Sequence, residues 1–441
     1  MRNALPEQLS FVYGLYIRVQ PRTAMTFRGT SALSICRLHR IVVTIAIAPF
    51  IAFLSFGQAT TGSRGSFDFN ERGIVFLSSD SSTHLVMRFR MQNWAVYSSQ
   101  FVPSGESPNL SAGSIELAPR RLRLRFGGSI MDPRLTVNLQ LAFSRRDMDW
   151  ADTEFPNIIR DAMVFWNFTP TLQVGFGQTK LPGNRQRVVS SGDQEFADRS
   201  IVNSAFTLDR DFGFQAYWRP LNASQILNLR ASITGGHGRN QPAIPGGGLA
   251  YTGRVEFLPL GAFTDGGDYV EGDLAREERP KLSLGLSAQH NESMTRTRGA
   301  LGDLLHSMRT AQVIYADGLL KYAGVSVYGE WARRSCANPV TTNGSSTAAV
   351  FTGTGYLLQA SYVFPSMISV AARYAVVEPS SLLASLPDYK RVTNLGANVG
   401  YYINGHRVKS SLEIGTTTNE DLNTNTEEYN LYSRLNLEVG I

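Results

Sequence analysis

The fold is decided by two stretches, RRLRLRF (residues 120–126) and LTVNLQLAF (residues 135–143), in which polar and apolar side chains alternate. In the first stretch arginine alternates with leucine or phenylalanine. Successive side chains of a β-strand point to opposite faces, so a period of two predicts a strand with one apolar and one polar face.

The same alternation recurs along the chain in about seventeen segments, from 67–78 to 428–441, and most of them have the roughly ten residues that a bilayer-spanning strand needs. Short connections with turn-forming residues alternate with long Gly/Ser/Asn-rich connections. This asymmetry is typical of an outer-membrane barrel, in which both chain ends lie on the periplasmic side. We therefore predict an all-β fold, a transmembrane antiparallel up-and-down β-barrel of about sixteen strands. The connection 260–280 is the exception, because it is long where a short turn is expected.

The composition agrees with a membrane barrel. Of the 441 residues, 18% are charged and 10% are aromatic, and the aromatic content argues against disorder. A single long apolar run argues against a helical membrane bundle. The net charge of +6 comes mainly from residues 1–59, which contain six arginines and one acidic residue. The rest of the chain is almost neutral, so we expect no nucleic-acid partner.

The N-terminal region predicts export. Arginine and histidine at 37–40 precede an uncharged, mostly apolar stretch from 41 to 56, which is followed by Gly57-Gln58-Ala59, the pattern of a cleavage site. We interpret residues 1–59 as a signal peptide, with Met25 as an alternative start, residues 60–83 as a periplasmic arm or plug, and residues 84–441 as the barrel.

Motifs for catalysis or for cofactors are not found in the sequence. The six histidines are scattered, so we expect no metal site and no cofactor. An outer-membrane barrel enzyme, a protease or lipase, is an alternative hypothesis, because His237, His290 and His306 lie near outward loops. A secreted soluble β-sandwich is a second alternative, which the long alternating segments oppose. We therefore expect a protein that is not an enzyme.

The most distinctive stretch is KLPGNRQRVVSSGDQEFADRSIVNSAFTLDRDFG (residues 180–213), in the position of the third outward loop. Ser191 or Asp193 can cap a short helix over residues 194–204. A loop of this length without strands of its own is usually functional.

This stretch resembles the phosphate-selective porin O and P family in the Lys180-Leu181-Pro182 start, the Asp198-Arg199-Ser200 core and the Arg210-Asp211-Phe212-Gly213 exit. The resemblance implies that the loop folds into the barrel and forms the constriction of a pore in the bacterial outer membrane. It also implies a homotrimer surrounded by outer-membrane lipid and lipopolysaccharide, through which small anionic or neutral solutes, including phosphate, diffuse.

The charges of the loop are balanced, five against five: Lys180, Arg185, Arg187, Arg199 and Arg210 against Asp193, Glu195, Asp198, Asp209 and Asp211. The strand phase places ten basic residues in the lumen: Arg88, Arg90, Arg121, Arg123, Arg125, Arg230, Arg254, Arg373, Lys409 and Arg434. It places six acidic residues there: Asp161, Asp211, Glu256, Glu330, Glu413 and Glu438.

An excess of positive charge in a water-filled lumen predicts a mild preference for anions. The five arginines of residues 88–125 would form one anion track, and Arg185, Arg187 and Arg199 would lie nearest the narrowest point. Alternatively, the lumen arginines pair with acids of the loop and only hold it in place.

Overall fold

The computed structural model describes residues 65–70, 73–102, 109–110, 113–148, 157–220, 226–241, 245–386 and 389–441. The predicted signal peptide, residues 1–59, and the alternative start at Met25 lie outside these residues. Residues 63–441 form one compact unit.

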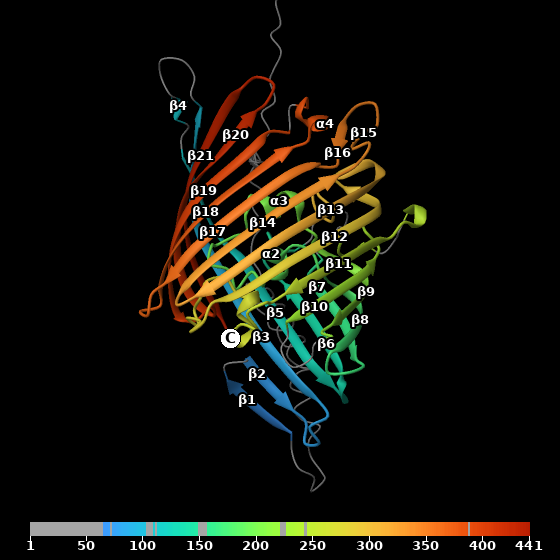
Figure 1. Cartoon of the computed structure of the whole chain (residues 1–441), viewed down its shortest axis with the longest axis vertical. Coiled ribbons are helices and arrows are strands. Elements are labelled where there is room, and N and C mark those ends of the chain that lie inside the picture. The colour runs from blue at the N-terminus through green and yellow to red at the C-terminus, as the bar shows by residue number, and fades with distance from the viewer. Residues whose placement is uncertain are drawn as a thin grey trace, which may run out of the picture. The chain divides into compact units, whose positions relative to one another are not determined.

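Sixteen long strands form a closed antiparallel barrel, which confirms the predicted fold (Figure 1). Each strand pairs with the next one, and the last strand pairs with the first, as in Tyr429↔Phe101. The sixteen strands are β3 (His84–Val102), β5 (Ser114–Ile130), β6 (Asp132–Ala142), β7 (Ile159–Asn167), β8 (Leu172–Lys180), β9 (Arg210–Trp218), β10 (Leu227–Thr234), β11 (Ala250–Phe257), β12 (Lys281–Arg296), β13 (Leu304–Tyr322), β14 (Val325–Ser335), β17 (Gly353–Val363), β18 (Ile368–Pro379), β19 (Arg391–Asn404), β20 (Val408–Asp421) and β21 (Thr426–Gly440).

The remaining elements are short and are not part of the ring of sixteen strands. β1 (Ser66–Asn70) and β2 (Gly73–Leu77) form a hairpin within the segment 60–83, and β2 pairs with the first residues of β3 beyond the end of β21. The others are β4 (Asn109–Leu110), β15 (Val340–Thr342), β16 (Thr347–Ala349), α2 (Arg185–Val188), α3 (Ile201–Phe206), α4 (Ser381–Ala384), η1 (Pro245–Gly247) and η2 (Thr264–Tyr269). Among the described residues, no helix is long and apolar enough to cross a membrane.

The apolar side chains of the strands point outward. In β17 the side chain of Leu358 is 55% exposed, whereas its neighbour Gln359 is 3% exposed and lies on the lumen side. An exposed leucine next to a buried glutamine is the reverse of the pattern in a water-soluble protein. This arrangement, together with the closed ring, excludes the soluble β-sandwich.

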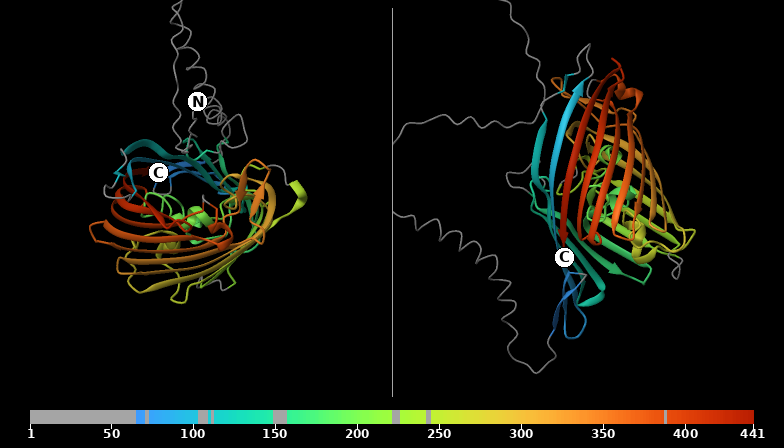
Figure 2. Two further views of the ribbon diagram at one scale, coloured as in Figure 1. Left: turned by 90° about the horizontal axis from the view of Figure 1, so that it is seen from above. Right: turned by 90° about the vertical axis from the view of Figure 1, so that its left-hand side faces the viewer.

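Two segments enter the barrel from opposite ends (Figure 2). The outer loop L3, residues 181–209, joins β8 to β9 and lies inside the ring of strands. The inner turn T4, residues 258–280, joins β11 to β12 at the end where β3 begins and β21 ends. The long connection 260–280 of the sequence is therefore part of the lumen rather than an external loop.

The outward face predicts a large cost for charge at the middle of a strand. Leu358→Arg should lower the free energy of unfolding by about 2–4 kcal/mol, because arginine would lie in the hydrocarbon near the bilayer midplane. Urea unfolding in lipid vesicles measures this difference. Ser345→Arg, on the exposed connection between β15 and β16, is the control and should change it by less than about 0.5 kcal/mol. Equal costs for the two variants would contradict the outward lipid contact.

Candidate pore constriction

The L3 loop is built from two short helices rather than the one predicted helix. The prediction of a helix over residues 194–204 is wrong: the helices are α2 and α3, and Ser200 caps α3 by accepting from the Asn203 backbone N–H at 3.2 Å. Ser191 cannot act as a cap because its hydroxyl accepts from Arg90 and Arg123 of the barrel wall, at 2.7 and 3.0 Å. Contacts with the wall override the local helix signal.

The apolar face of α3 packs against the barrel wall. Val202 and Phe206 are fully buried, and they approach the wall where β17 has Gly355. A Cβ atom at residue 355 would lie 2.7 Å from the Phe206 ring and 3.0 Å from Val202 Cγ1, so a glycine is needed for this close approach. The Phe206 carbonyl also accepts from Arg334 of β14 at 2.8 Å.

On the side of β10–β13, the carboxylates of Asp317 and Glu256 balance the guanidinium groups of Arg185 and Arg254. Arg185 of L3 donates to Asp317 of β13 at 2.6 Å, and Arg254 of β11 donates to the same carboxylate at 2.7 Å. Arg254 also pairs with Glu256 at 2.8 Å, and none of these four side chains is more than 2% exposed. In addition, Glu256 pairs with Arg230 of β10 at 3.4 Å. Arg185, which we expected near the narrowest point of the pore, is therefore fixed to the wall.

On the opposite side, towards β3–β9, arginines outnumber acids. Asp147 binds two arginines, Arg123 of β5 and Arg160 of β7. Burial opposes ionisation of the Asp147 carboxyl, but the two guanidinium groups hold its pKa well below the usual range. In the same way, Asp198 of L3 pairs with both Arg120 at 2.9 Å and Arg121 at 2.7 Å.

Asp209, at the end of L3, is shared by three arginines. It pairs with Arg187 of L3, with Arg210 at 3.4 Å and with Arg239 at 3.4 Å. Arg210 also pairs with Asp161 of β7 at 2.9 Å. Seven arginines thus share four carboxylates on this side of the loop.

Lys180 and Arg199 add two charges that carboxylates do not balance. Lys180 Nζ donates to the Val188 and Val189 carbonyls at 3.0 and 3.1 Å, and Arg199 donates to the Gln186 and Val189 carbonyls at 2.8 Å. Within the described residues, no carboxylate lies within salt-bridge distance of either group. Burial and the neighbouring Arg187 lower the pKa of Arg199 well below the usual range for arginine.

On this cationic side of the constriction, these contacts involve nine basic groups and four acidic groups, a net of five positive charges among them. The basic groups are Arg120, Arg121, Arg123, Arg160, Lys180, Arg187, Arg199, Arg210 and Arg239, and the acids are Asp147, Asp161, Asp198 and Asp209. Asp211 of β9 is a further buried acid on this side, and its carboxylate accepts from the Gly236 backbone N–H at 2.6 Å. The balance of the loop alone, five against five, is misleading because residues of the wall contribute to the same site.

The five arginines expected to form an anion track lie on two adjacent strands. Arg88 lies opposite Arg125, and Arg90 opposite Arg123. Arg88 and Arg125 are exposed, and Arg125 donates to Asn138 at 2.8 Å. Arg90 donates to the Ser191 carbonyl at 2.8 Å and Arg121 to the Ala197 carbonyl at 3.4 Å, so both arginines are part of the network that holds L3. Arg90 also pairs with Glu438 of β21.

The remaining predicted site residues are not among the charged groups of the cationic side. Arg373 of β18 is 3% exposed, donates to the Asp198 carbonyl at 3.0 Å and covers the Phe196 ring. Arg230 of β10 lies towards the inner end of the lumen. Asp193 and Glu195 are on the part of L3 that contacts T4.

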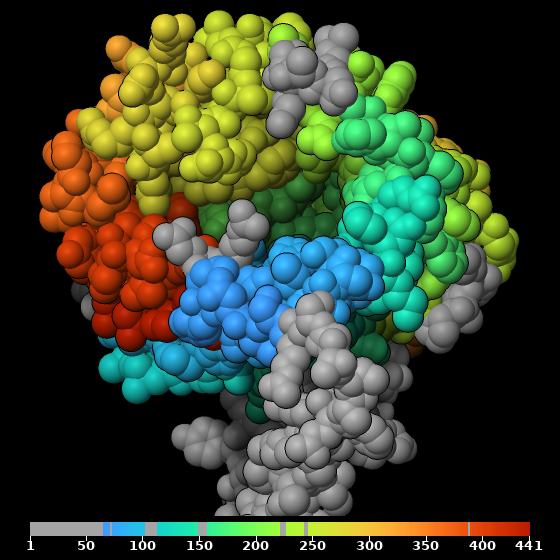
Figure 3. Space-filling model, turned by 90° about the horizontal axis from the view of Figure 1, so that it is seen from below, coloured from blue at the N-terminus to red at the C-terminus, as the bar shows by residue number. Residues whose placement is uncertain are grey.

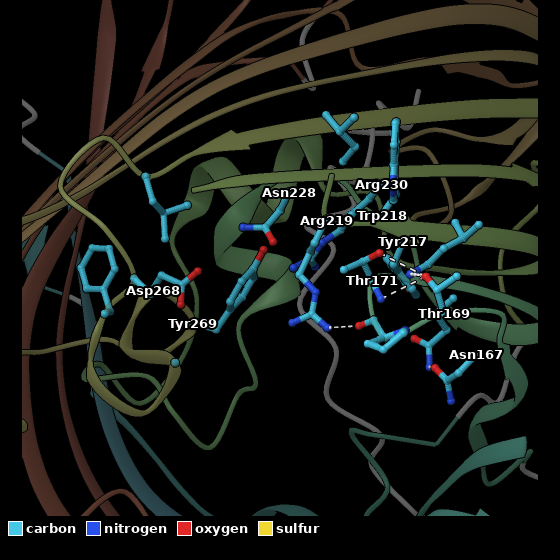
Figure 4. A pocket seen from close by; sticks show the side chains of 18 residues that line it. Asn167, Thr169, Thr171, Tyr217, Trp218, Arg219, Asn228, Arg230, Asp268 and Tyr269 are labelled. Atoms are coloured by element: carbon cyan, nitrogen blue, oxygen red, sulfur yellow. Dashed lines mark hydrogen bonds between the residues drawn. The ribbon is translucent and has the colours of Figure 1, made fainter. Parts of the chain in front are cut away.

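The inner end of the lumen contains a cavity of about 440 Å³ between T4 and the strands β8–β10 (Figure 4). Arg230 lies between the rings of Tyr217 and Tyr269, 5.6 and 4.7 Å from their centres. Arg219 donates to the Pro170 carbonyl at 3.1 Å. Seen from below, the mouth of the barrel is hollowed (Figure 3). Two further arginines therefore line the exit from the constriction.

Sequence reasoning missed Arg160, Arg239 and Asp147 as parts of the constriction. Arg239 and Asp147 lie on other outer loops, and no pattern in the sequence shows that these loops reach L3. It also missed T4, although the length of the connection 260–280 was a signal. Among the described residues, no group of three or more His, Cys, Asp or Glu side chains could hold a metal ion.

A closed barrel with an apolar outer face, a charged lumen and a long inward loop defines a pore-forming protein of the bacterial outer membrane. The family model of the phosphate-selective porins O and P matches residues 110–368. The chain belongs to this family, so it is a porin through which small solutes diffuse passively, and the predicted family and location are confirmed.

Solved structures show the same fold at low sequence identity. The outer-membrane channel DcaP of Acinetobacter baumannii is 12% identical, with a TM-score of 0.51, and the match covers 82% of this chain and 98% of that chain. The anion-selective porin from Comamonas acidovorans is also 12% identical, with a TM-score of 0.50, covering 81% and 100%. OmpF of Salmonella typhi, in complex with daunomycin, is 12% identical, with a TM-score of 0.51, and the match covers 82% of this chain and 98% of that chain. No curated protein matches the sequence.

The shared carboxylate of Asp147 gives a prediction about stability. Asp147→Asn should lower the free energy of unfolding by about 3–5 kcal/mol, because Arg123 and Arg160 would remain buried without a counter-charge. Asp132→Asn is the control: Asp132 pairs with the exposed Arg134, so its loss should cost about 0–1 kcal/mol. Urea unfolding of the refolded protein measures both. A cost for Asp147→Asn no larger than that of the control would mean that water already screens this pair.

Proposed function

We propose that this porin prefers small anions, including phosphate, and that the cationic side of the constriction produces the preference. The single observation that supports this is the excess of nine basic over four acidic groups beside L3, with Lys180 and Arg199 bound to carbonyl oxygens instead of carboxylates. A narrow lumen with low-dielectric walls focuses the field of such an excess, which raises the local concentration of anions.

The arginines on either side of the constriction extend this field along the lumen. Arg88 and Arg125 line the wall of β3 and β5, and Arg219 and Arg230 line the inner cavity. Both alternatives for the lumen arginines apply. Arg185 and Arg254 only hold the loop, whereas the arginines on the side of β3–β9 hold the loop and also provide the charge excess.

The preference can be measured in planar bilayers under a KCl gradient. The reversal potential of the wild-type protein should have the sign of an anion-preferring channel. Lys180→Gln/Arg199→Gln should move it towards zero, because two of the five excess positive charges are removed. Arg134→Gln/Arg391→Gln is the matched control, because it removes the same charge from exposed positions and should leave the potential unchanged. A wild-type reversal potential of the cation-preferring sign would overturn the proposal.

We also propose that the protein is a homotrimer in contact with outer-membrane lipid and lipopolysaccharide, as membership of the family suggests. Chemical cross-linking in isolated outer membranes, followed by gel electrophoresis, should give dimer and trimer bands and no larger product. A single monomer band under the same conditions would contradict the trimer.

A barrel hydrolase is the second candidate function, and one contact favours it. His306 Nε2 lies 3.1 Å from Ser346 Oγ in a cavity of about 770 Å³ at the outer end. Among the described residues, no carboxylate lies within 4.0 Å of His306 to orient its imidazole, and Ser346 lies on an exposed turn. Esterase activity that is lost in Ser346→Ala would support the hydrolase. We propose that the protein has no such activity and acts as a channel.

A further inference from the structure

The T4 turn and the L3 loop meet inside the barrel, on the side opposite the cationic groups. The Glu271 backbone N–H of T4 donates to the Asp193 carbonyl of L3 at 2.7 Å. In return, the Glu195 backbone N–H of L3 donates to Glu271 Oε2 at 3.0 Å. The backbone of Gly272 is also so close that a Cβ atom there would lie 2.7 Å from Glu195 Oε1. The two segments therefore obstruct this part of the lumen together.

Two buried carboxyl groups lie at this contact. Glu195 is 2% exposed and Glu271 is 7% exposed. They share one hydrogen-bond donor, because Gln359 Nε2 donates to Glu195 Oε2 at 3.2 Å and to Glu271 Oε2 at 3.1 Å. Two ionised carboxylates that share one amide in a buried site repel each other, and a single proton between them removes most of the repulsion.

A small cavity beside the pair contains groups without partners. Its volume is about 10 Å³, which is the room that one water molecule needs. Glu195 Oε1, Glu271 Oε1 and Gln186 Nε2 belong to residues that line it, and these three buried atoms have no hydrogen-bond partner among the described residues. One water molecule could accept from the amide and donate to both carboxyl groups, so the cavity suits a hydrated, singly protonated pair.

We propose that Glu195 and Glu271 form a proton-dependent latch that holds T4 against L3 at low pH and releases T4 as the pH rises. The latch deepens the proposed function and rests on it, because it regulates the width of the same pore. With one proton bound, the pair holds the two segments together. With both carboxylates ionised, their repulsion favours movement of T4 towards the inner mouth.

The pKa of Glu195 is raised to about 7, mainly because the carboxyl group is buried and to a smaller extent because the Glu271 carboxylate lies beside it. In the open latch the carboxyl group is hydrated and its pKa is the usual one, about 4.3. The closed latch is therefore favoured fully below about pH 4 and loses stability as the pH rises to about 7. Between pH 5 and pH 7 the ratio of closed to open latch should fall by roughly 40-fold, because the change per pH unit becomes smaller near each of the two pKa values.

Other ionisable groups that face the pair do not replace it as the switch. Lys321 of β13 and Lys409 of β20 are bound to backbone carbonyls of T4 and L3. The pKa of His406 is lowered well below its usual range, mainly by burial and to a smaller extent by the charge of Lys409, so the imidazole stays neutral over this pH interval. Its Nε2 contacts the Glu271 carbonyl at 2.9 Å.

The remaining facing groups are acids, phenols and paired arginines. Burial raises the pKa of Asp193 and of Asp268, which makes them the two carboxyl groups that the experiment must separate from the latch. The other facing groups are Tyr328 of β14, Tyr402 of β19, Arg185 of L3 and Arg373 of β18. The arginines remain charged, and the phenols remain neutral, between pH 5 and pH 8.

Single-channel conductance between pH 5 and pH 8, in symmetrical KCl, tests the latch. The wild-type conductance should be higher at pH 8 than at pH 5. In Glu195→Gln the side chain is neutral at every pH, so the conductance should stay at the wild-type pH 5 level throughout. Glu271→Gln should behave in the same way, and it provides a second variant if the first one does not fold. Heat-modifiable gel migration checks the folding of both.

The matched control is Glu116→Gln, which removes a half-exposed carboxylate that pairs with Arg146 at the outer rim and should keep the wild-type pH dependence. A wild-type conductance that does not change with pH would overturn the latch, and so would wild-type pH dependence in both glutamine variants, since Asp193 or Asp268 would then be the switch. A reversal potential of the anion-preferring sign, measured separately under the KCl gradient, would leave the proposed function intact. A protein that conducts at no pH would overturn both.

Discussion

Buried arginines that need a counter-charge are the constraint on which this structure depends. An L3 guanidinium inside the barrel is stable only where a carboxylate or several carbonyl oxygens receive it, because a buried charge without a partner costs several kcal/mol. Asp317 and Glu256 meet this need for Arg185 and Arg254, and this fixes the loop across the lumen. Towards β3–β9 the carboxylates are too few, so the same residue type leaves the excess of positive charge to which we attribute the proposed anion preference.

The position of L3 follows from contacts that are distant in sequence. Arg185 and Asp317 are 132 residues apart, and Gln359 is 164 residues from Glu195. Only the closure of the ring brings these strands around one loop. T4 reaches the same loop from the opposite end, so one side of the lumen is closed by protein and the other remains polar and basic.

The alternation of residues was sufficient to predict the barrel. Each strand contacts lipid with one face and water with the other, so apolar and polar residues alternate with a period of two, as in residues 120–126. The site was less predictable. The resemblance located L3, but the partners of its charges lie on other strands and loops, so a charge count for L3 alone missed Arg160 and Asp147. The predicted helix over 194–204 was wrong because wall arginines bind Ser191, and a local pattern contains no information about such contacts.

The most direct measurement of the central claim is a disulfide between L3 and the wall. Val202 Cγ1 lies 3.0 Å from the position of a Cβ atom at residue 355, which suits a disulfide between Val202→Cys and Gly355→Cys. The background is Phe206→Ala/Cys336→Ala, because the Phe206 ring lies 2.7 Å from the new Cβ atom and Cys336 is a free thiol. The structure predicts that this pair cross-links under mild oxidation in outer membranes, whereas Val202→Cys with Ser345→Cys does not. Free thiols in the first pair, in a protein that is folded by heat-modifiable migration, would show that L3 does not lie across the lumen.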